Sequence, residues 1–166
     1  SKERYKDQKE LVEIVKQYRR RRIPLDGIIQ DWQYWDEGEW GRKKFDEERF
    51  PDPSGLMEEL HSLNAHAMIS VWPNFGEVPE KQPFSERHLL LPDNQFYNAF
   101  DPAARELLWQ QMNDGIFKHG FDGWWCDSSE PYDGQFFYEG RYRPEPWERT
   151  ALNKAEFSKI IDPEFI

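Results

Sequence analysis

Apolar residues recur along the chain with two different periods, which predicts helices that alternate with buried strands. In residues 2–22, Leu11, Ile14, Val15 and Tyr18 fall at helical spacing and form one apolar face. Short runs that are almost entirely apolar predict strands buried on both faces, as in a parallel sheet. By these patterns the helices are residues 2–22, 54–63, 101–119 and 148–160, and the strands are residues 25–32, 65–72 and 121–126.

This alternation of helices and strands predicts an α/β fold with a parallel sheet. Neither of the first two strands leads into the glycine-rich turn of a dinucleotide-binding fold. The pattern therefore favours a (β/α)8 TIM barrel over a doubly wound nucleotide fold. A closed barrel needs eight strands, and only three are visible, so we expect residues 1–166 to form a partial barrel of about three βα units.

Each predicted strand ends in a distinctive residue, namely Asp31, Trp72 and Asp127. In a parallel barrel the active site gathers at the carboxyl ends of the strands. Three successive strands would therefore aim a carboxylate, an indole and a second carboxylate at one cavity. The two long segments 36–53 and 73–100 leave from the same edge, and loops of such length in compact domains are usually functional or mobile.

The segment around Asp127 is the most informative part of the chain. Trp124 and Trp125 stand beside this carboxylate, and Glu130 follows three residues later. Indole rings offer flat faces to the C–H bonds of a sugar, and a carboxylate can attack an oxocarbenium-like centre. The segment therefore suits a glycosidase nucleophile. A strand-end aspartate can equally be a turn cap, and two adjacent tryptophans can be core.

The other candidate residues also have two interpretations. Glu130 could be the acid partner of Asp127, but three residues along one turn rarely place two carboxyl groups on opposite sides of a substrate, so we favour an orienting role. Asp31 could accept hydrogen bonds from sugar hydroxyls, or it could be a buried acid satisfied by backbone N–H groups. Trp72 could form the floor of a sugar site, or it could be plain core.

Composition narrows the function. The net charge of −10 argues against nucleic-acid binding, and we interpret the basic run 19–22 as a helix end, where cations are favourable. No apolar run approaches membrane-spanning length. Cys126 is the sole cysteine, so no intrachain disulfide can form, and cysteine usage does not distinguish an oxidising from a reducing compartment. We expect no cofactor and no metal site, because no ligand spacing relates the four histidines, His61, His66, His88 and His119.

Several segments, in order, resemble glycoside hydrolase family 31, the retaining α-glucosidases and α-xylosidases. Trp125, Asp127, Glu130 and Pro131 match the nucleophile pattern of the family: an aromatic, one residue, Asp, two residues, Glu-Pro. Residues 28–35 are similar to its second barrel strand, and residues 68–73 to the end of its third. Further matching segments are residues 50–53, 100–102, 109–111 and 120–122.

The resemblance implies barrel strands 2–4 of a retaining α-glycosidase. It implies Asp127 as nucleophile and Asp31, Trp72 and Trp125 as substrate-binding residues, while Glu130 keeps the orienting role that its spacing favours. The family's general acid belongs to parts outside residues 1–166, so we expect the rest of the parent enzyme as a partner, an oligosaccharide as substrate, and no activity from this chain alone. The sequences of residues 32–35 and 124–131 are more similar to those of α-xylosidases than to those of α-glucosidases. An α-glucosidase, a transglucosylase and a non-catalytic carbohydrate-binding or structural piece remain alternatives.

Overall fold

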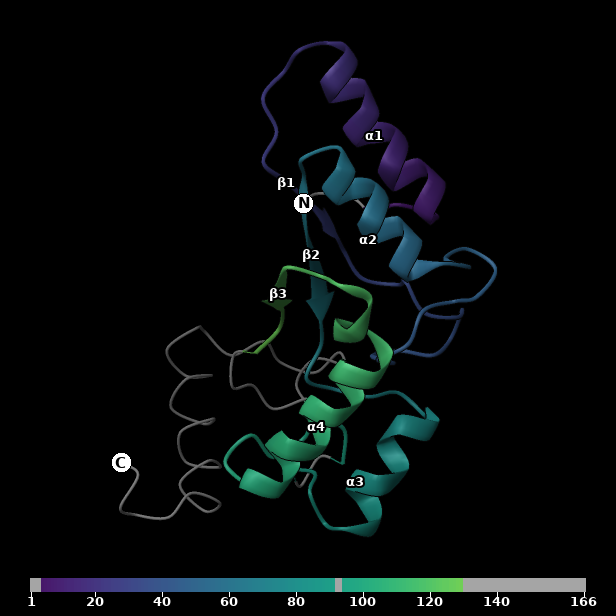
Figure 1. Cartoon of the computed structure of the whole chain (residues 1–166). Helices are drawn as coiled ribbons and strands as arrows, with labels where there is room; N and C mark the ends of the chain where they lie inside the picture. Colours follow the sequence, from purple (N-terminus) through teal and green to yellow (C-terminus); the bar gives the residue numbers. More distant parts are fainter. Residues whose placement is uncertain (1–3, 92–93, 130–166) are drawn as a thin grey trace, which may run out of the picture.

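A parallel sheet of three strands forms the centre of the molecule (Figure 1). The computed structural model describes residues 4–91 and 94–129. The sheet order is β1 (Gly27–Gln30), β2 (His66–Val71) and β3 (Gly123–Cys126), with Gly27 beside His66 and Met68 beside Gly123. The predicted strands and their parallel arrangement are confirmed, with each strand shorter than predicted.

Helices cover one face of this sheet. α1 (Gln8–Arg20) and α2 (Pro53–Ser62) lie side by side against it (Figure 1). Alternate residues of β2 face the helices and are buried, namely Ala67, Ile69 and Val71. Met68, between them, is 38% exposed on the opposite face. The described part of the chain therefore forms two layers, with the second face of its sheet left uncovered by these helices.

The helices begin where the sequence places aspartates. Asp7, Asp52 and Asp101 each accept a hydrogen bond from a backbone N–H in the first turn of α1, α2 and α4 (Pro102–Gly115), respectively. Proline follows at the start of α2 and α4, where its missing N–H costs nothing. The helix start predicted at residues 101–102 is confirmed.

The segment 73–100 is more structured than the predicted long loop. It contains a 3-10 helix, Pro79–Lys81, and a short helix α3 (Gln82–Glu86). These elements pack with α4 around a second apolar cluster, Phe75, Val78, Phe84, Leu89, Ala104 and Leu107. The local propensity of the segment is low because of its prolines and charges, so tertiary packing determines these turns.

The predicted helix 101–119 is divided into two. α4 ends at Gly115, and a separate 3-10 helix follows at Phe117–His119. The backbone of Lys43 approaches so closely that a Cβ atom at Gly115 would lie 1.6 Å from the Lys43 carbonyl oxygen. Gly120 then ends the 3-10 helix with φ of 99°, as its predicted role as a stop requires.

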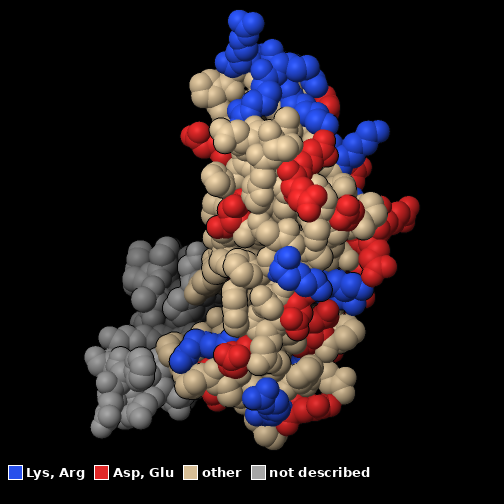
Figure 2. All heavy atoms as spheres, viewed as in Figure 1, with Lys and Arg blue, Asp and Glu red and all other residues tan. Residues whose placement is uncertain are grey.

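The basic run at the end of α1 is partly a structural clamp. Lys and Arg gather at this end of the molecule (Figure 2). The Arg19 guanidinium donates to the carbonyl oxygens of Leu25, Leu63 and Asn64 at 2.7–2.8 Å. It thereby joins the ends of α1 and α2 to the chain that enters β1. In the described ranges no helix is long and apolar enough to cross a membrane.

Candidate active site

The three strand-end residues lie at the same edge of the sheet. Asp31, Trp72 and Asp127 directly follow the last residues of β1, β2 and β3. Because the strands are parallel and Val71 is level with Cys126, Trp72 and Asp127 leave the sheet side by side. β1 ends level with Ile69, so Asp31 leaves the sheet a little earlier. The predicted candidates therefore come together at the carboxyl edge, where barrel active sites form.

Asp127 is fixed by its backbone. Its N–H lies 3.0 Å from the carbonyl oxygens of both Val71 and Trp125, which continues the β2–β3 pairing. Its carboxylate oxygen Oδ1 accepts a hydrogen bond of 2.8 Å from the backbone N–H of Ser128, a residue with φ of 49°. This turn shows that Asp127 does act as a cap. Within the described residues Oδ2 accepts no hydrogen bond, so the same carboxylate retains an oxygen for chemistry.

Asp31 has the same local arrangement. Its Oδ1 accepts a hydrogen bond of 2.8 Å from the backbone N–H of Trp32, and the side chain is 7% exposed. Burial of a carboxylate is costly unless hydrogen bonds compensate. The two carboxylates are therefore held by equivalent bonds to the following residue, one deep in the sheet edge and one, Asp127, half-buried.

Trp124 and Trp125 have different environments. The Trp124 ring packs against Trp109 of α4 and Phe117, with ring centroids 6.3 Å and 5.9 Å away. Its role in the described part is therefore packing on the helix side. Side chains alternate along a strand, so Trp125, level with Ser70, belongs to the sheet face opposite these helices.

Trp72 belongs to a tryptophan cluster that also contains Trp32, Trp35 and Trp40. Trp40 is at its centre, with its ring centroid 4.9 Å from that of Trp72 and 5.4 Å from that of Trp32. The indole N–H of Trp40 donates to Asn74 Oδ1 at 3.2 Å. Trp40 lies in segment 36–53, which the sequence indicated only as a polar loop. An isolated tryptophan among charged residues was the available signal.

Lys43, like Trp40, is a residue of the site that the sequence pattern did not indicate. It is 2% exposed, and its Nζ donates to the carbonyl oxygen of Trp72 at 2.8 Å and to that of Gly41. The ammonium also lies 4.6 Å from the centroid of the Phe75 ring. Burial lowers the pKa of Lys43 to about 7, against an opposing effect of Glu80. A buried cation thus anchors the backbone of the residue that the sequence singled out.

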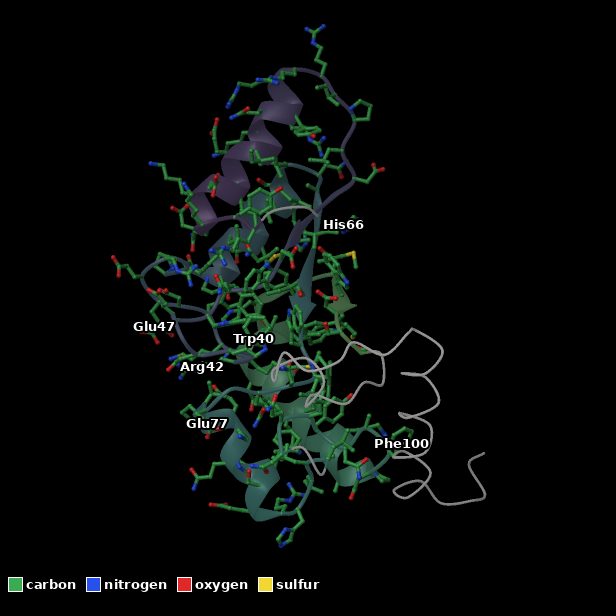
Figure 3. All side chains as sticks on the ribbon, turned by 180° about the vertical axis from the view of Figure 1, so that it is seen from behind. Trp40, Arg42, Glu47, His66, Glu77 and Phe100 are labelled. Atoms are coloured by element: carbon green, nitrogen blue, oxygen red, sulfur yellow. The ribbon has the colours of Figure 1, made fainter. Side chains whose placement is uncertain are left out.

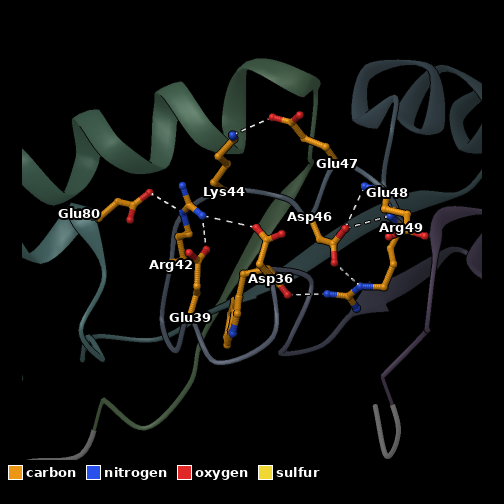
Figure 4. A network of polar contacts seen from close by, with 10 residues as sticks. Asp36, Glu39, Arg42, Lys44, Asp46, Glu47, Glu48, Arg49 and Glu80 are labelled. Carbon is orange, nitrogen blue, oxygen red and sulfur yellow. Dashed lines mark hydrogen bonds and ion pairs between the residues drawn. The ribbon is translucent and has the colours of Figure 1, made fainter.

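Ion pairs hold the rest of this loop (Figure 4). The Arg42 guanidinium pairs with Glu80 at 3.0 Å and with Asp36 at 3.4 Å, and it also contacts Glu39. Separately, Arg49 pairs with Asp46 at 2.7 Å and donates to the Gln33 carbonyl oxygen at 2.8 Å.

The pKa of Asp46 responds to two opposing effects. Burial raises it, but hydrogen bonds from Arg49 and from the Glu48 backbone outweigh burial and lower it. Asp46 is therefore ionised and holds Arg49, which connects segment 36–53 to Gln33, just after β1. The Arg42–Glu80 pair connects segment 36–53 to segment 73–100.

Glu130 and Pro131 lie outside the described residues, as do the predicted loop 132–147 and helix 148–160. The orienting role of Glu130 therefore stays a prediction. The geometry brings together two carboxylates, a tryptophan cluster and a buried lysine at the carboxyl edge of a parallel sheet.

Comparison with known proteins identifies the family. Residues 1–157 match the model of the glycosyl hydrolases family 31 TIM-barrel domain. The chain belongs to glycosyl hydrolase family 31. The three-stranded parallel sheet with its helices is therefore a piece of this family's barrel, and the family resemblance is confirmed.

Curated family 31 relatives include α-xylosidases. An α-xylosidase of Saccharolobus solfataricus is 43% identical over 136 residues, which cover 81% of this chain and 18% of that protein. An uncharacterised family 31 glucosidase of Pseudescherichia vulneris is 30% identical over 159 residues, covering 86% of this chain and 30% of the relative. The chain thus spans less than a third of the length of these relatives.

Solved structures of family 31 have the same fold. The α-xylosidase of Xanthomonas citri superposes with a TM-score of 0.71 at 35% identity, over 75% of this chain and 15% of that one. An α-xylosidase from a soil metagenome, solved with xylose, also gives a TM-score of 0.71, at 27% identity over 77% of this chain and 21% of that one.

Proposed function

We propose that this chain supplies part of the catalytic barrel, strands 2–4, of a retaining α-xylosidase, with Asp127 as the nucleophile. The observation that supports the proposal most is Asp127 itself: a half-buried carboxylate, fixed at a strand end of a family 31 barrel domain, with Oδ2 accepting no hydrogen bond within the described residues. The names of two relatives, at 43% and 35% identity, support xylose as the sugar.

The reaction would proceed in two steps. Asp127 Oδ2 attacks the anomeric carbon, the bond to the leaving oxygen breaks, and an acid from outside this chain protonates that oxygen. Water, deprotonated by the same group, then attacks the anomeric carbon and releases Asp127 as a carboxylate. Asp31 would accept hydrogen bonds from sugar hydroxyls, Trp72 and Trp125 would offer ring faces, and Glu130 would orient the nucleophile.

Trapping of the intermediate tests the nucleophile. In the full-length protein a fluorinated α-xylosyl fluoride should accumulate a covalent adduct, and peptide mapping should place it on Asp127. Asp127→Asn preserves an acceptor for the Ser128 N–H but removes the nucleophile, so adduct and turnover should both disappear while the fold remains. Asp114→Asn, an exposed acid of α4, is the control. An adduct on any other residue would reject Asp127.

The relative named a family 31 glucosidase supports a second candidate, an α-glucosidase or α-transglucosylase. Xylose lacks the hydroxymethyl group of glucose, so the two activities differ in whether the site has room for it. Relative kcat/KM values for an aryl α-xyloside and the matching α-glucoside separate them, and product analysis with a sugar acceptor detects transfer. A non-catalytic piece would give neither adduct nor turnover in the full-length protein, but would still bind xylose.

A further inference from the structure

A second cluster of polar side chains lies at the opposite edge of the sheet. His61 is in the last turn of α2, His66 is the first residue of β2, and Asp122 directly precedes β3. One ligand-capable atom from each lies within 4.8 Å of the others. Figure 3 shows His66 and Trp40 toward opposite ends of β2. The cluster is thus remote from the candidate active site.

We propose that His61, His66 and Asp122 bind a divalent transition-metal ion, with Zn²⁺ as the best match. Two imidazole nitrogens and one carboxylate form a donor set that suits Zn²⁺, whereas Ca²⁺ and Mg²⁺ prefer oxygen ligands. No residue of this set belongs to the candidate active site, so the inference does not depend on the proposed function.

The distances suit an ion. His61 Nε2 lies 3.0 Å and 3.2 Å from the two Asp122 oxygens, and His66 Nδ1 lies 3.2 Å from Oδ1. With metal–ligand bonds of about 2.0–2.1 Å, the ligand atoms of a tetrahedral site are roughly 3.3 Å apart. The histidine–aspartate separations therefore need to widen by only a few tenths of an ångström, and the two imidazole nitrogens, which lie within 4.8 Å of each other, need to take a similar spacing. With three protein ligands, the fourth position is left for water.

Asp122 is already held in position. Its Oδ2 accepts a hydrogen bond of 2.8 Å from the Ala67 N–H, and its own N–H donates to the Ala67 carbonyl oxygen at 2.9 Å. The histidine side chains are 42% and 75% exposed, so the ion has an entry path.

A metal here would have a structural role. It would join the end of α2 to the starts of β2 and β3, positions 61 residues apart in the sequence between His61 and Asp122. In TIM barrels this edge serves stability, whereas the other edge serves chemistry. The ion would bind the folded chain in preference to the unfolded chain and would raise the unfolding temperature as its concentration rises.

The decisive experiment is a metal titration of the full-length protein, purified without a polyhistidine tag and stripped with a chelator. Co²⁺ should give the visible absorption of a tetrahedral nitrogen–oxygen site, Zn²⁺ should displace it, and the stoichiometry should be one ion per chain. His66→Gln changes a mostly exposed side chain and should weaken Zn²⁺ binding at least tenfold, the size of effect that loss of a supporting partner already produces.

His88→Gln is the matched control, because His88 is exposed and outside the cluster. It should leave both the Co²⁺ spectrum and the Zn²⁺-induced rise in unfolding temperature unchanged. Equal Zn²⁺ affinity in wild type and His66→Gln, or no bound metal in the wild type, would overturn the proposal and leave the cluster as a pair of hydrogen bonds. A His61→Gln variant must reproduce the His66→Gln result, since both rings are required.

Discussion

Replacement of Lys43 by Met tests whether the buried amine that binds the Trp72 carbonyl oxygen has a lowered pKa. Methionine has a similar length but no charge, so it removes the hydrogen bonds to the carbonyl oxygens of Trp72 and Gly41. An unsatisfied buried acceptor costs about 1–3 kcal/mol, while removal of a buried charge is favourable. Because these effects oppose each other at a single pH, the pH dependence of the difference is the informative quantity.

The sign follows from the pKa of Lys43. Burial lowers it from 10.5 in the unfolded chain to about 7 in the folded one. Between these values the unfolded chain binds more protons, so the stability of the wild type rises with pH, by at most about 1.4 kcal/mol per unit. From pH 7 to pH 9 the wild type should gain about 2 kcal/mol relative to Lys43→Met.

Urea unfolding followed by tryptophan fluorescence measures this difference, since Trp72 lies beside the mutated position. Both proteins are compared at pH 7 and pH 9, so that other titrating groups cancel. Lys44→Met is the control: the Lys44 side chain is 47% exposed and pairs with Glu47, so this substitution removes no buried amine and should leave the pH dependence of the wild type intact. A constant difference between wild type and Lys43→Met would refute the reasoning, because the carbonyl oxygens and the Phe75 ring would then keep the ammonium charged.

Three further substitutions test other parts of the structure. Gly115→Ala should destabilise the fold in a thermal melt despite the roughly 1 kcal/mol advantage of alanine in a helix, because its Cβ would meet the Lys43 carbonyl oxygen at 1.6 Å; a higher melting temperature would show that the loop yields. Tyr34→Phe should be neutral or stabilising, because within the described residues the buried hydroxyl has no hydrogen-bond partner. Burial raises the pKa of Tyr34, so the wild type should lose more stability than Tyr34→Phe as pH rises above 10, and equal losses would contradict this. Asp31→Asn in the full-length protein should weaken binding of a monosaccharide inhibitor by about 1.5–3 kcal/mol, and calorimetry showing unchanged affinity would contradict a substrate role.

The sequence predicts the sheet well because buried parallel strands leave an unmistakable pattern. The apolar run 65–72 contains the whole of β2, and the Asp-Pro pair at residues 101–102 marks the start of α4. The strand-end positions of Asp31 and Asp127 follow from the same reasoning, since a strand boundary is a local property. Their catalytic roles are a different matter and stay predictions.

The missed features all depend on contacts between distant segments. The burial of Lys43 depends on the carbonyl oxygen of Trp72, which is 29 residues away. The close packing of the same loop on the end of α4 also depends on the fold, because the Lys43 backbone leaves no space for a side chain at Gly115. The proximity of His61, His66 and Asp122 is likewise invisible in the histidine spacing, since Asp122 joins the two histidines only in the folded sheet. Local patterns contain none of this information.

These contacts between distant segments determine the geometry of the predicted site residues. Trp72 leaves β2 toward the candidate site, but Lys43 binds its carbonyl oxygen and Trp40 packs on its ring. A Cβ atom at Gly41 would lie 2.0 Å from the carbonyl oxygen of Asn74, so the loop backbone packs in direct contact with the chain that follows β2. Substitutions of Trp40 or Lys43 in segment 36–53 should therefore displace Trp72, so this loop as well as the strands determines the shape of the site.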